Sequence, residues 1–207
     1  MQNIDQLIYI YAAHALFWGA FGVALTIRRR LNRAVLATPA SGNAAPVAQP
    51  GEVTAPYSRA ALVVHICAFA LMYLGINATL ASGSPGNYFR AQGVVGALLI
   101  AYGAALAVWA VLHFASWRFR AKLGEGHQLA TGGPFRFIRN PIYLGLNFLA
   151  LGTAVWLPSL LLWIACLLMF AGSDIRARAE EGVLKLRFGA EYMTYQARTR
   201  RFIPGIY

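Results

Sequence analysis

The chain has 207 residues, of which 58% are hydrophobic and only 12% are charged. This composition lies outside the range of soluble globular domains and is typical of proteins that cross a membrane several times. A net charge of +11 would suggest a nucleic-acid partner for a soluble protein, but basic residues beside apolar spans instead reflect membrane orientation and anionic lipid headgroups. The composition therefore predicts an integral membrane protein and argues against a nucleic-acid partner.

Three segments in the first part of the chain are long and apolar enough to cross a bilayer. They cover residues 7–27, 60–80 and 94–114, and none of them contains Asp, Glu, Lys or Arg. Each is close to the roughly 20 residues that span the hydrocarbon core. The first lacks the basic residues that precede the apolar stretch of a secretory signal peptide, so we expect it to remain as a helix. Residues 34–56 are expected to form a flexible linker.

A longer apolar run extends from Ile142 to Gly172 and is interrupted at Pro158. A proline here is compatible with one kinked helix or with two helices in a hairpin. The tail beyond Gly172 is rich in Lys and Arg, and positive segments resist translocation across the membrane. We therefore expect a hairpin with spans at 142–156 and 159–173, which returns the tail to the side that holds the earlier basic loops.

These elements predict an all-α fold with a single domain over residues 1–207, formed by five transmembrane helices and a cytoplasmic C-terminal helix. With the N-terminus outside, every Lys and Arg except Arg90 lies on the cytoplasmic side, which supports this topology. The expected location is the inner or plasma membrane. The same topology brings residues 115–145 and 174–204 to one membrane face, where they can form a joint site.

The turn before the fourth span also fits a purely structural role. Gly132–Pro134 can be only a turn, and Asn140–Pro141 can be only a helix start, because proline suits the first helical turn. That role leaves unexplained why Arg136, Arg139 and Tyr143 surround the same turn. The segment is therefore a candidate binding site.

The predicted tail helix carries adjacent glutamates that also have two explanations. Arg176 with Glu180, and Glu181 with Lys185, stand four residues apart, a spacing that stabilises exposed helices by a few tenths of a kcal/mol. Neighbouring helical residues point about 100° apart. At most one of Glu180 and Glu181 is therefore expected to face a shared pocket, while the other pairs or faces water.

The four histidines lie on separate segments without the paired spacing of a metal site, so we expect no metal. They are His14, His65, His113 and His127. His14 and His65 fall inside the spans and are expected to form hydrogen bonds between helices, although ionisable residues at membrane depth can be functional.

Three separated elements follow one another along roughly residues 109–204. The first is His127-Gln128-Leu129 with the turn GPFRFIRNPIYLG from Gly133 to Gly145. The second is Glu180-Glu181, and the third runs from Phe188-Gly189 through Tyr192 and Tyr195 to Arg198. Together they resemble the isoprenylcysteine carboxyl methyltransferase family and the related phospholipid methyltransferases.

Two positions depart from the pattern of that family. Phe135 stands where tyrosine is common, and Asn140 stands where the family often has histidine. An asparagine cannot carry a proton, so acid-base work at position 140 is not expected here.

The resemblance implies a membrane methyltransferase that holds S-adenosylmethionine with the turn, the last span and the tail. The residues that it implies as cofactor-binding are His127, Gln128, Leu129, Gly133, Pro134, Arg139, Asn140, Pro141, Tyr143, Glu180, Glu181, Tyr192 and Tyr195. Arg139 is expected to face the carboxylate of this cofactor, and Glu180 or Glu181 its ammonium. The tyrosines are expected to contact the sulfonium or the adenine.

The resemblance also implies a lipophilic acceptor, most closely a carboxylate of an isoprenylcysteine-like lipid that enters between the helices. A carboxylate is ionised at neutral pH and needs only a cationic clamp, for which Arg198 is the first candidate and Arg178 the second. Arg198 and Glu181 are the residues expected to act in catalysis. An amine would need a base, and Asn140 is not one.

Other functions stay open from the sequence alone. Within enzymes, they are N-methylation of a phospholipid or an amine and S-methylation of a small thiol. A membrane scaffold or transporter that keeps the fold without turnover is the alternative from another class.

Overall fold

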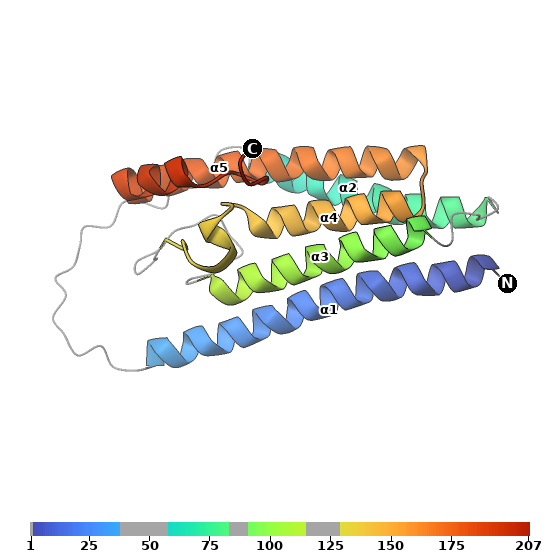
Figure 1. Cartoon of the computed structure of the whole chain (residues 1–207), viewed down its shortest axis with the longest axis horizontal. Coiled ribbons are helices and arrows are strands. Elements are labelled where there is room, and N and C mark those ends of the chain that lie inside the picture. Colours follow the sequence, from blue (N-terminus) through green and yellow to red (C-terminus); the bar gives the residue numbers. More distant parts are fainter. Residues whose placement is uncertain (1, 38–57, 83–90, 115–128) are drawn as a thin grey trace.

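The computed structural model describes residues 2–37, 58–82, 91–114 and 129–207. The regular secondary structure within these ranges is helical (Figure 1). The elements are α1 (Gln2–Ala37), α2 (Ser58–Ala81), α3 (Ala91–His113), the short 3-10 helix η2 (Gly133–Arg136), α4 (Pro141–Trp156) and α5 (Leu160–Arg198). The predicted all-α fold is confirmed for this part of the chain.

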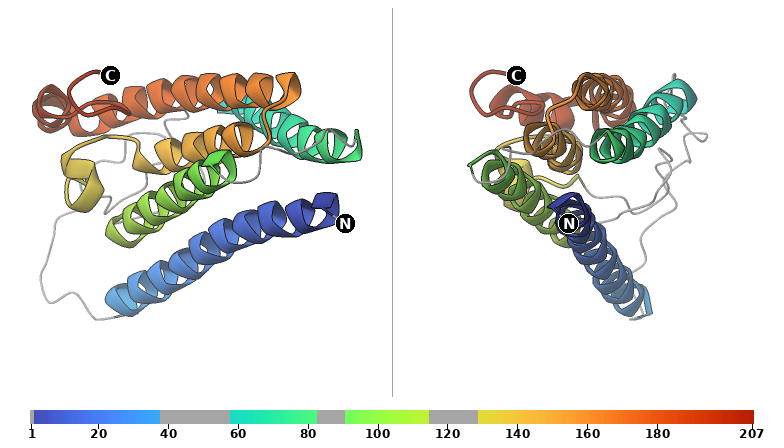
Figure 2. Two further views of the ribbon diagram at one scale, coloured as in Figure 1. Left: turned by 45° about the vertical axis from the view of Figure 1, so that its right-hand side comes forward. Right: turned by 90° about the vertical axis from the view of Figure 1, so that its right-hand side faces the viewer.

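The long helices alternate in direction and form a bundle (Figures 1 and 2). α3 packs between α1 and α4, and α5 packs between α4 and α2, whereas α1 and α2 make little direct contact. The end of α3, the start of α4 and the last turns of α5 consequently lie toward the end of the bundle that carries η2 (Figure 1).

Two pairs of glycines let α3 and α4 approach closely. A Cβ atom on Gly103 would stand 2.6 Å from the carbonyl oxygen of Gly145, and one on Gly96 would stand 2.6 Å from that of Gly152. Seven residues, about two helical turns, separate the pairs on each helix, so the pairs meet in register between antiparallel helices. Small residues at such crossings allow backbone contact, and here they fix the start of α4.

A tight hairpin joins α4 to α5. Leu157 ends α4 with its backbone N–H bonded to the Thr153 carbonyl, and Ser159 caps α5 by accepting a hydrogen bond from the Leu162 N–H. Pro158 lies between these two caps, where its missing N–H costs no helical hydrogen bond. The hairpin that we predicted in preference to one kinked helix is therefore confirmed.

The helical boundaries in the C-terminal part differ from the prediction. α5 continues from the expected span at 159–173 into the expected tail helix without a break at Gly172, and its only non-helical residue is Gly189. The onset of charge after Gly172 marks a change of surroundings and not the end of a helix. The expected C-terminal helix and the expected last span are thus parts of one continuous helix.

Four of the helices are long and apolar enough to cross a membrane, by length and composition, within the described residues. They are α1, α2, α3 and α5, while α4 is a shorter apolar helix of 16 residues. The bundle also presents many large apolar side chains outward, including Leu16, Leu98 and Leu167. An apolar outer surface of this kind is expected of a protein surrounded by lipid.

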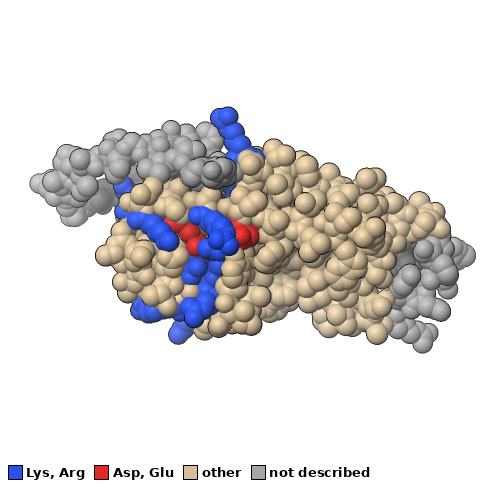
Figure 3. All heavy atoms as spheres, turned by 90° about the horizontal axis from the view of Figure 1, so that it is seen from above, with Lys and Arg blue, Asp and Glu red and all other residues tan. Residues whose placement is uncertain are grey.

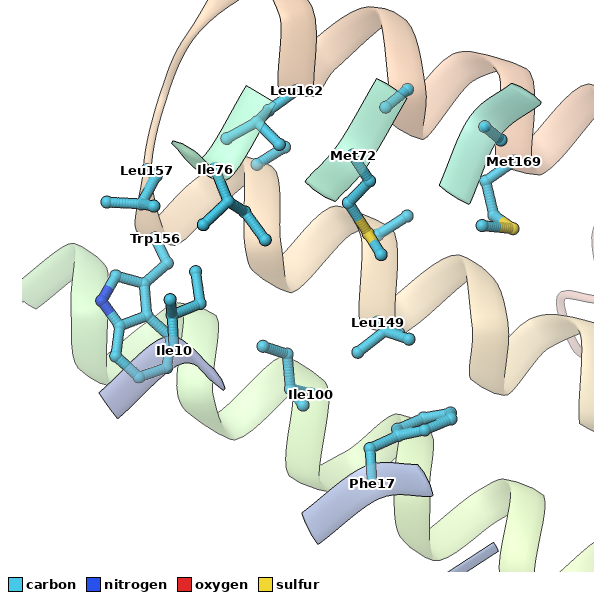
Figure 4. Packing of buried hydrophobic residues seen from close by; sticks show 14 of the residues in the cluster. Ile10, Phe17, Met72, Ile76, Ile100, Leu149, Trp156, Leu157, Leu162 and Met169 are labelled. Atoms are coloured by element: carbon cyan, nitrogen blue, oxygen red, sulfur yellow. The ribbon is translucent and has the colours of Figure 1, made fainter. Parts of the chain in front are cut away.

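The centre of the bundle is filled by side chains from all five long helices (Figure 4). Ile10 and Phe17 of α1, Met72 of α2, Ile100 of α3 and Leu149 of α4 are all at most 2% exposed. Met169 and Leu162 of α5 complete the same cluster. This core connects α1 and α2 to the α3–α4–α5 layer.

The two histidines within the expected spans each form hydrogen bonds that link one helix to another. His14 of α1 bonds Thr153 of α4 through Nε2 at 2.9 Å and Tyr73 of α2 through Nδ1 at 3.2 Å. His65 of α2 bonds Ser173 of α5 through Nε2 at 3.3 Å. The predicted interhelical hydrogen bonds of His14 and His65 are confirmed.

Candidate active site

The turn before α4 requires glycine at position 133 for two reasons. Gly133 has φ of +56°, a left-handed conformation that residues with a side chain rarely adopt. A Cβ atom there would also stand 2.5 Å from Cγ of His113 at the end of α3. Pro134 follows as an early residue of η2, where its fixed φ suits the helical start. The turn is thereby held against α3.

The residues after this turn pair with the tail that follows α5. Ile138 and Arg200 form a parallel bridge. The backbone N–H of Arg139 donates to the Arg200 carbonyl at 2.7 Å, and that of Asn140 donates to the Arg201 carbonyl at 3.2 Å. The turn and the C-terminal segment therefore meet, as the joint site required.

Glu181 is the centre of the contact between these segments. Its carboxylate accepts five hydrogen bonds, from Nε of Arg139, Nε and Nη2 of Arg201, Nδ2 of Asn140 and Nε2 of Gln196. The two bonds from Arg201 and the one from Asn140 are each 3.0 Å, and that from Arg139 is 3.1 Å. Glu181 thus links α5 to the turn and to the tail.

The charge balance explains why Glu181 can be buried. The residue is 3% exposed, and removing an unpaired carboxylate from water costs several kcal/mol. Burial alone would raise the pKa of Glu181, but hydrogen bonds and positive charge from Arg201 and Arg139 outweigh it and hold the pKa below its ordinary value. Two guanidinium groups against one carboxylate leave the cluster with local positive charge, partly balanced by Asp174 3.2 Å from Arg201.

Glu180 belongs to a second, more open group of polar side chains. Its Oε1 accepts a hydrogen bond from the Tyr143 hydroxyl at 2.6 Å and one from Nε of Arg176 at 3.2 Å. The guanidinium of Arg176 also lies 5.8 Å from the centre of the Tyr143 ring. The Glu180 side chain is 31% exposed, so it remains more accessible than Glu181.

Two buried tyrosines near the end of α5 border the site. Gly189, with φ of +50°, kinks the helix just before them. Tyr192 and Tyr195 are 0% and 5% exposed, with ring centres 5.9 Å apart. The Tyr195 hydroxyl donates to the carbonyl oxygen of Phe135 at 2.8 Å, which ties the kinked segment to η2. The hydroxyl of Tyr192 is buried and has no hydrogen-bond partner among the described residues.

The structure brings most of the expected site residues together. Gly133, Pro134, Arg139, Asn140, Pro141, Tyr143, Glu180, Glu181, Tyr192 and Tyr195 all lie in the turn, at the start of α4 or on the facing part of α5. Leu129 is half-buried just before the turn. His127 and Gln128 lie outside the described residues.

The two arginines expected to clamp the acceptor lie elsewhere. Arg198 is exposed on the last turn of α5, and Arg178 is exposed and paired with Asp174 at 2.7 Å. Arg201, which was not among the expected site residues, instead takes the half-buried position beside Glu181. It also donates to the hydroxyl of Tyr207 at 2.9 Å. Helical spacing gave no signal for Arg201, because this residue follows the helix in a segment that pairs with the turn.

Charged side chains gather toward one end of the face that α5 presents, and the other described residues visible on that face are uncharged (Figure 3). A charged site therefore sits beside an extensive apolar surface. Such a combination suits a reaction between a charged molecule and a lipophilic one.

Comparisons with known proteins agree with this geometry. Residues 91–191 match the phospholipid methyltransferase family. Among solved structures, the chain is similar to the eukaryotic intramembrane Ras methyltransferase, isoprenylcysteine carboxyl methyltransferase, with a TM-score of 0.63 and 19% sequence identity over 100% of this chain and 68% of that one. A search of the curated proteins found no significant match. The resemblance read from the motifs is thus confirmed: residues 91–191 are similar to the phospholipid methyltransferases, and the chain has the fold of isoprenylcysteine carboxyl methyltransferase.

Proposed function

We propose that this enzyme transfers a methyl group from S-adenosylmethionine to the carboxylate of an isoprenylcysteine-like lipid. The observation that carries the proposal is the cluster in which Glu181 of α5 joins Arg139 of the turn to Arg201 of the tail. This cluster builds a charged site at one end of a bundle whose outer surface is apolar. A water-soluble methyl donor and an oily acceptor can meet at such a boundary.

The residues fit the polar groups of S-adenosylmethionine. Both carboxylate oxygens of Glu181 accept bonds from the protein, so we assign the ammonium of the cofactor to the more open Glu180. Arg139 uses Nε and Nη1 for Glu181 and backbone carbonyls, and we assign its Nη2 to the carboxylate of the cofactor. The unpaired hydroxyl of Tyr192 supplies a further polar group for the cofactor. When bound, S-adenosylmethionine supplies a methyl group on a positively charged sulfur.

The protein's part in the transfer is positioning. A carboxylate acceptor is already ionised, so no residue has to remove a proton. Arg139 and Arg201 give the site the positive charge that attracts a carboxylate, and we assign the clamp to Arg201 because Arg198 is exposed. Buried Tyr192 and Tyr195 exclude water from the same region. Holding two reactants in line can supply much of the rate enhancement.

We further infer that all five long helices cross the membrane, with the N-terminus outside and the site on the cytoplasmic side. α4 is about 24 Å long at 1.5 Å per residue, somewhat less than the roughly 30 Å hydrocarbon core. Its antiparallel packing between α3 and α5 supports a span, because it lies along two helices that are long enough. The distribution of Lys and Arg supports the orientation.

Transfer of a radiolabelled methyl group to N-acetyl-S-farnesylcysteine by the purified protein in lipid nanodiscs tests the proposal. The expected product loses its label on mild base treatment, because methyl esters hydrolyse and N-methyl and S-methyl groups do not. Protein with Glu181→Gln is the matched control and should transfer far less label. Label that survives base, or equal transfer by the variant, would contradict the proposed reaction.

A second candidate function is N-methylation of an amine lipid, because the family that matches residues 91–191 is named for phospholipid methyltransfer. Replacing the acceptor with phosphatidylethanolamine vesicles in the same assay distinguishes the two reactions. Base-stable label in the lipid fraction would favour the amine. Titration with S-adenosylhomocysteine addresses the non-catalytic alternative, since a scaffold without turnover has no reason to bind the product saturably.

A further inference from the structure

The hydrogen bonds of the two membrane-embedded histidines differ in how many protons they require. The Thr153 hydroxyl donates its one hydrogen to the Leu149 carbonyl at 2.7 Å, so Nε2 of His14 must donate to Thr153 Oγ1. The Tyr73 hydroxyl then donates to Nδ1 of His14, and it accepts from Nε1 of Trp18 at 3.2 Å. Every group in this chain is satisfied when His14 is neutral.

The same assignment of hydrogen atoms around His65 gives a different protonation state. Nδ1 of His65 lies 3.0 Å from the Ala61 carbonyl, which can only accept, so Nδ1 carries a hydrogen. The Ser173 hydroxyl donates its one hydrogen to Oδ1 of Asn147 at 3.0 Å. Nε2 of His65, 3.3 Å from Ser173 Oγ, must therefore donate as well. With both nitrogens donating, this arrangement of hydrogen bonds corresponds to a protonated, positively charged ring.

A neutral His65 keeps both of these contacts as hydrogen bonds when the amide of Asn147 is turned over. Its Nδ2 would then donate to Ser173, and the Ser173 hydroxyl would donate to Nε2 of His65. The two orientations of an amide occupy the same space. In either one, a buried polar atom of Asn147 lacks a partner among the described residues, as its Nδ2 does in the first orientation. Neither arrangement is fully satisfied, in contrast to the chain around His14.

We propose that His65, Ser173 and Asn147 form a proton-binding site between α2, α4 and α5, in which the amide of Asn147 reverses when His65 gains or loses a proton. Reversal allows the serine to donate toward Asn147 in the charged state and toward His65 in the neutral state. The ligand is a single proton. The site is distinct from the residues assigned to the cofactor and the acceptor.

The surroundings of His65 connect this site to the candidate active site. From α4, the ring faces Tyr143, with ring centres 6.0 Å apart. From α5, the positive charge of Arg176 acts on the ring and opposes its protonation, and Arg176 is itself paired with Glu180 at 3.2 Å. Gly172 of α5 admits the imidazole, since a Cβ there would stand 3.0 Å from Nδ1. A proton on His65 therefore adds positive charge beside the Tyr143–Glu180–Arg176 group.

Nuclear magnetic resonance of protein labelled with 15N-histidine in nanodiscs tests the proposal without any methyl acceptor. The chain has four histidines, and His14→Asn and His65→Asn variants assign their signals. Between about pH 5 and 9, the ring nitrogens of His65 should change from a neutral pattern to that of a doubly protonated ring, while His14 keeps its Nε2–H form. A His65 ring that stays neutral with hydrogen on Nδ1 throughout would overturn the proposal.

Two substitutions at position 147 provide an independent measurement. Asn147→Leu removes the acceptor that the charged state requires and should move proton binding at His65 down by about one pH unit or more. Asn147→Asp supplies a carboxylate and should move it up by a similar amount. Unchanged signals of His14 report intact packing in each variant. The same midpoint in both variants and in the wild type would contradict the relay. Because this readout is independent of turnover, it can fail or succeed separately from the proposed methyl transfer.

Discussion

Replacing Arg201 by glutamine tests the architecture of the site most directly. Arg201 binds Glu181 through two hydrogen bonds of 3.0 Å and contacts Asp174 at 3.2 Å. Removing one partner of a buried ion pair costs about 3 to 5 kcal/mol. Arg139 remains on Glu181, and the Arg201 side chain is 14% exposed, so we expect a cost at or below the lower end of that range, about 2 to 3 kcal/mol.

If the tail must close over the site when ligand binds, the same free energy is lost from binding, and the affinity for S-adenosylhomocysteine falls by about 30- to 150-fold. Isothermal titration of the purified protein measures this change. Arg198→Gln is a matched control, because it makes the same substitution on an exposed residue of the same segment and should change affinity by less than about 3-fold. Equal losses for Arg198→Gln and Arg201→Gln would refute the reasoning that the contact between Arg201 and Glu181 closes the tail over the site. A larger loss for Arg198→Gln would show that the exposed arginine supports the cofactor site more than Arg201 does.

Three further predictions concern other parts of the molecule. Gly189→Ala strains the positive-φ kink and should lower stability by about 1 kcal/mol, as measured by thermal unfolding. It should also weaken S-adenosylhomocysteine binding in a titration. An unchanged affinity would show that the kink does not contribute to the site. Gly145→Leu forces a side chain into the α3–α4 contact and should greatly reduce the yield of folded monomer by size-exclusion chromatography, whereas Leu144→Ala should not. Folding lowers the pKa of Glu181 below its ordinary value of 4.5. The stabilisation from its carboxylate is therefore present above pH 4.5 and is lost as the pH falls through the folded pKa. The midpoint of thermal unfolding should decline more steeply with acid in the wild type than in Glu181→Gln.

The order and position of the helices were largely predictable because they depend on local features of the sequence. Apolar length locates the spans, and Pro158 together with the basic tail distinguishes a hairpin from a kink. The boundary between the last span and the tail was not predictable in this way. Charge begins after Gly172, but nothing in the backbone of that segment ends a helix, so α5 continues.

The candidate site was predictable as a set of segments and less so as a set of contacts. Motif order brought the turn and α5 together, and it identified Glu181. The expected partner of Glu181 was Lys185, four residues along the helix, but its carboxylate is bound by Arg139 and Arg201, 42 and 20 residues away. Helical spacing reports neighbours on one helix, whereas these arginines reach Glu181 because the tail pairs with Ile138 to Asn140. That pairing has no signature in local periodicity.

The length of α5 explains how the proposed site can serve both a charged and a lipophilic molecule. Counting the roughly 20 residues that cross a bilayer core from Leu160 reaches Glu180, so the glutamates come where the helix leaves the hydrocarbon. A helix that stopped at Gly172 would end within the apolar layer, where the charged cluster would face a large desolvation cost. Because α5 instead continues to Arg198, its first part can lie in the hydrocarbon layer while its last part carries Glu181 and Tyr192 and leads into the tail. In the proposed reaction, the continuity of this helix therefore brings an acceptor held in lipid within reach of a donor held in water.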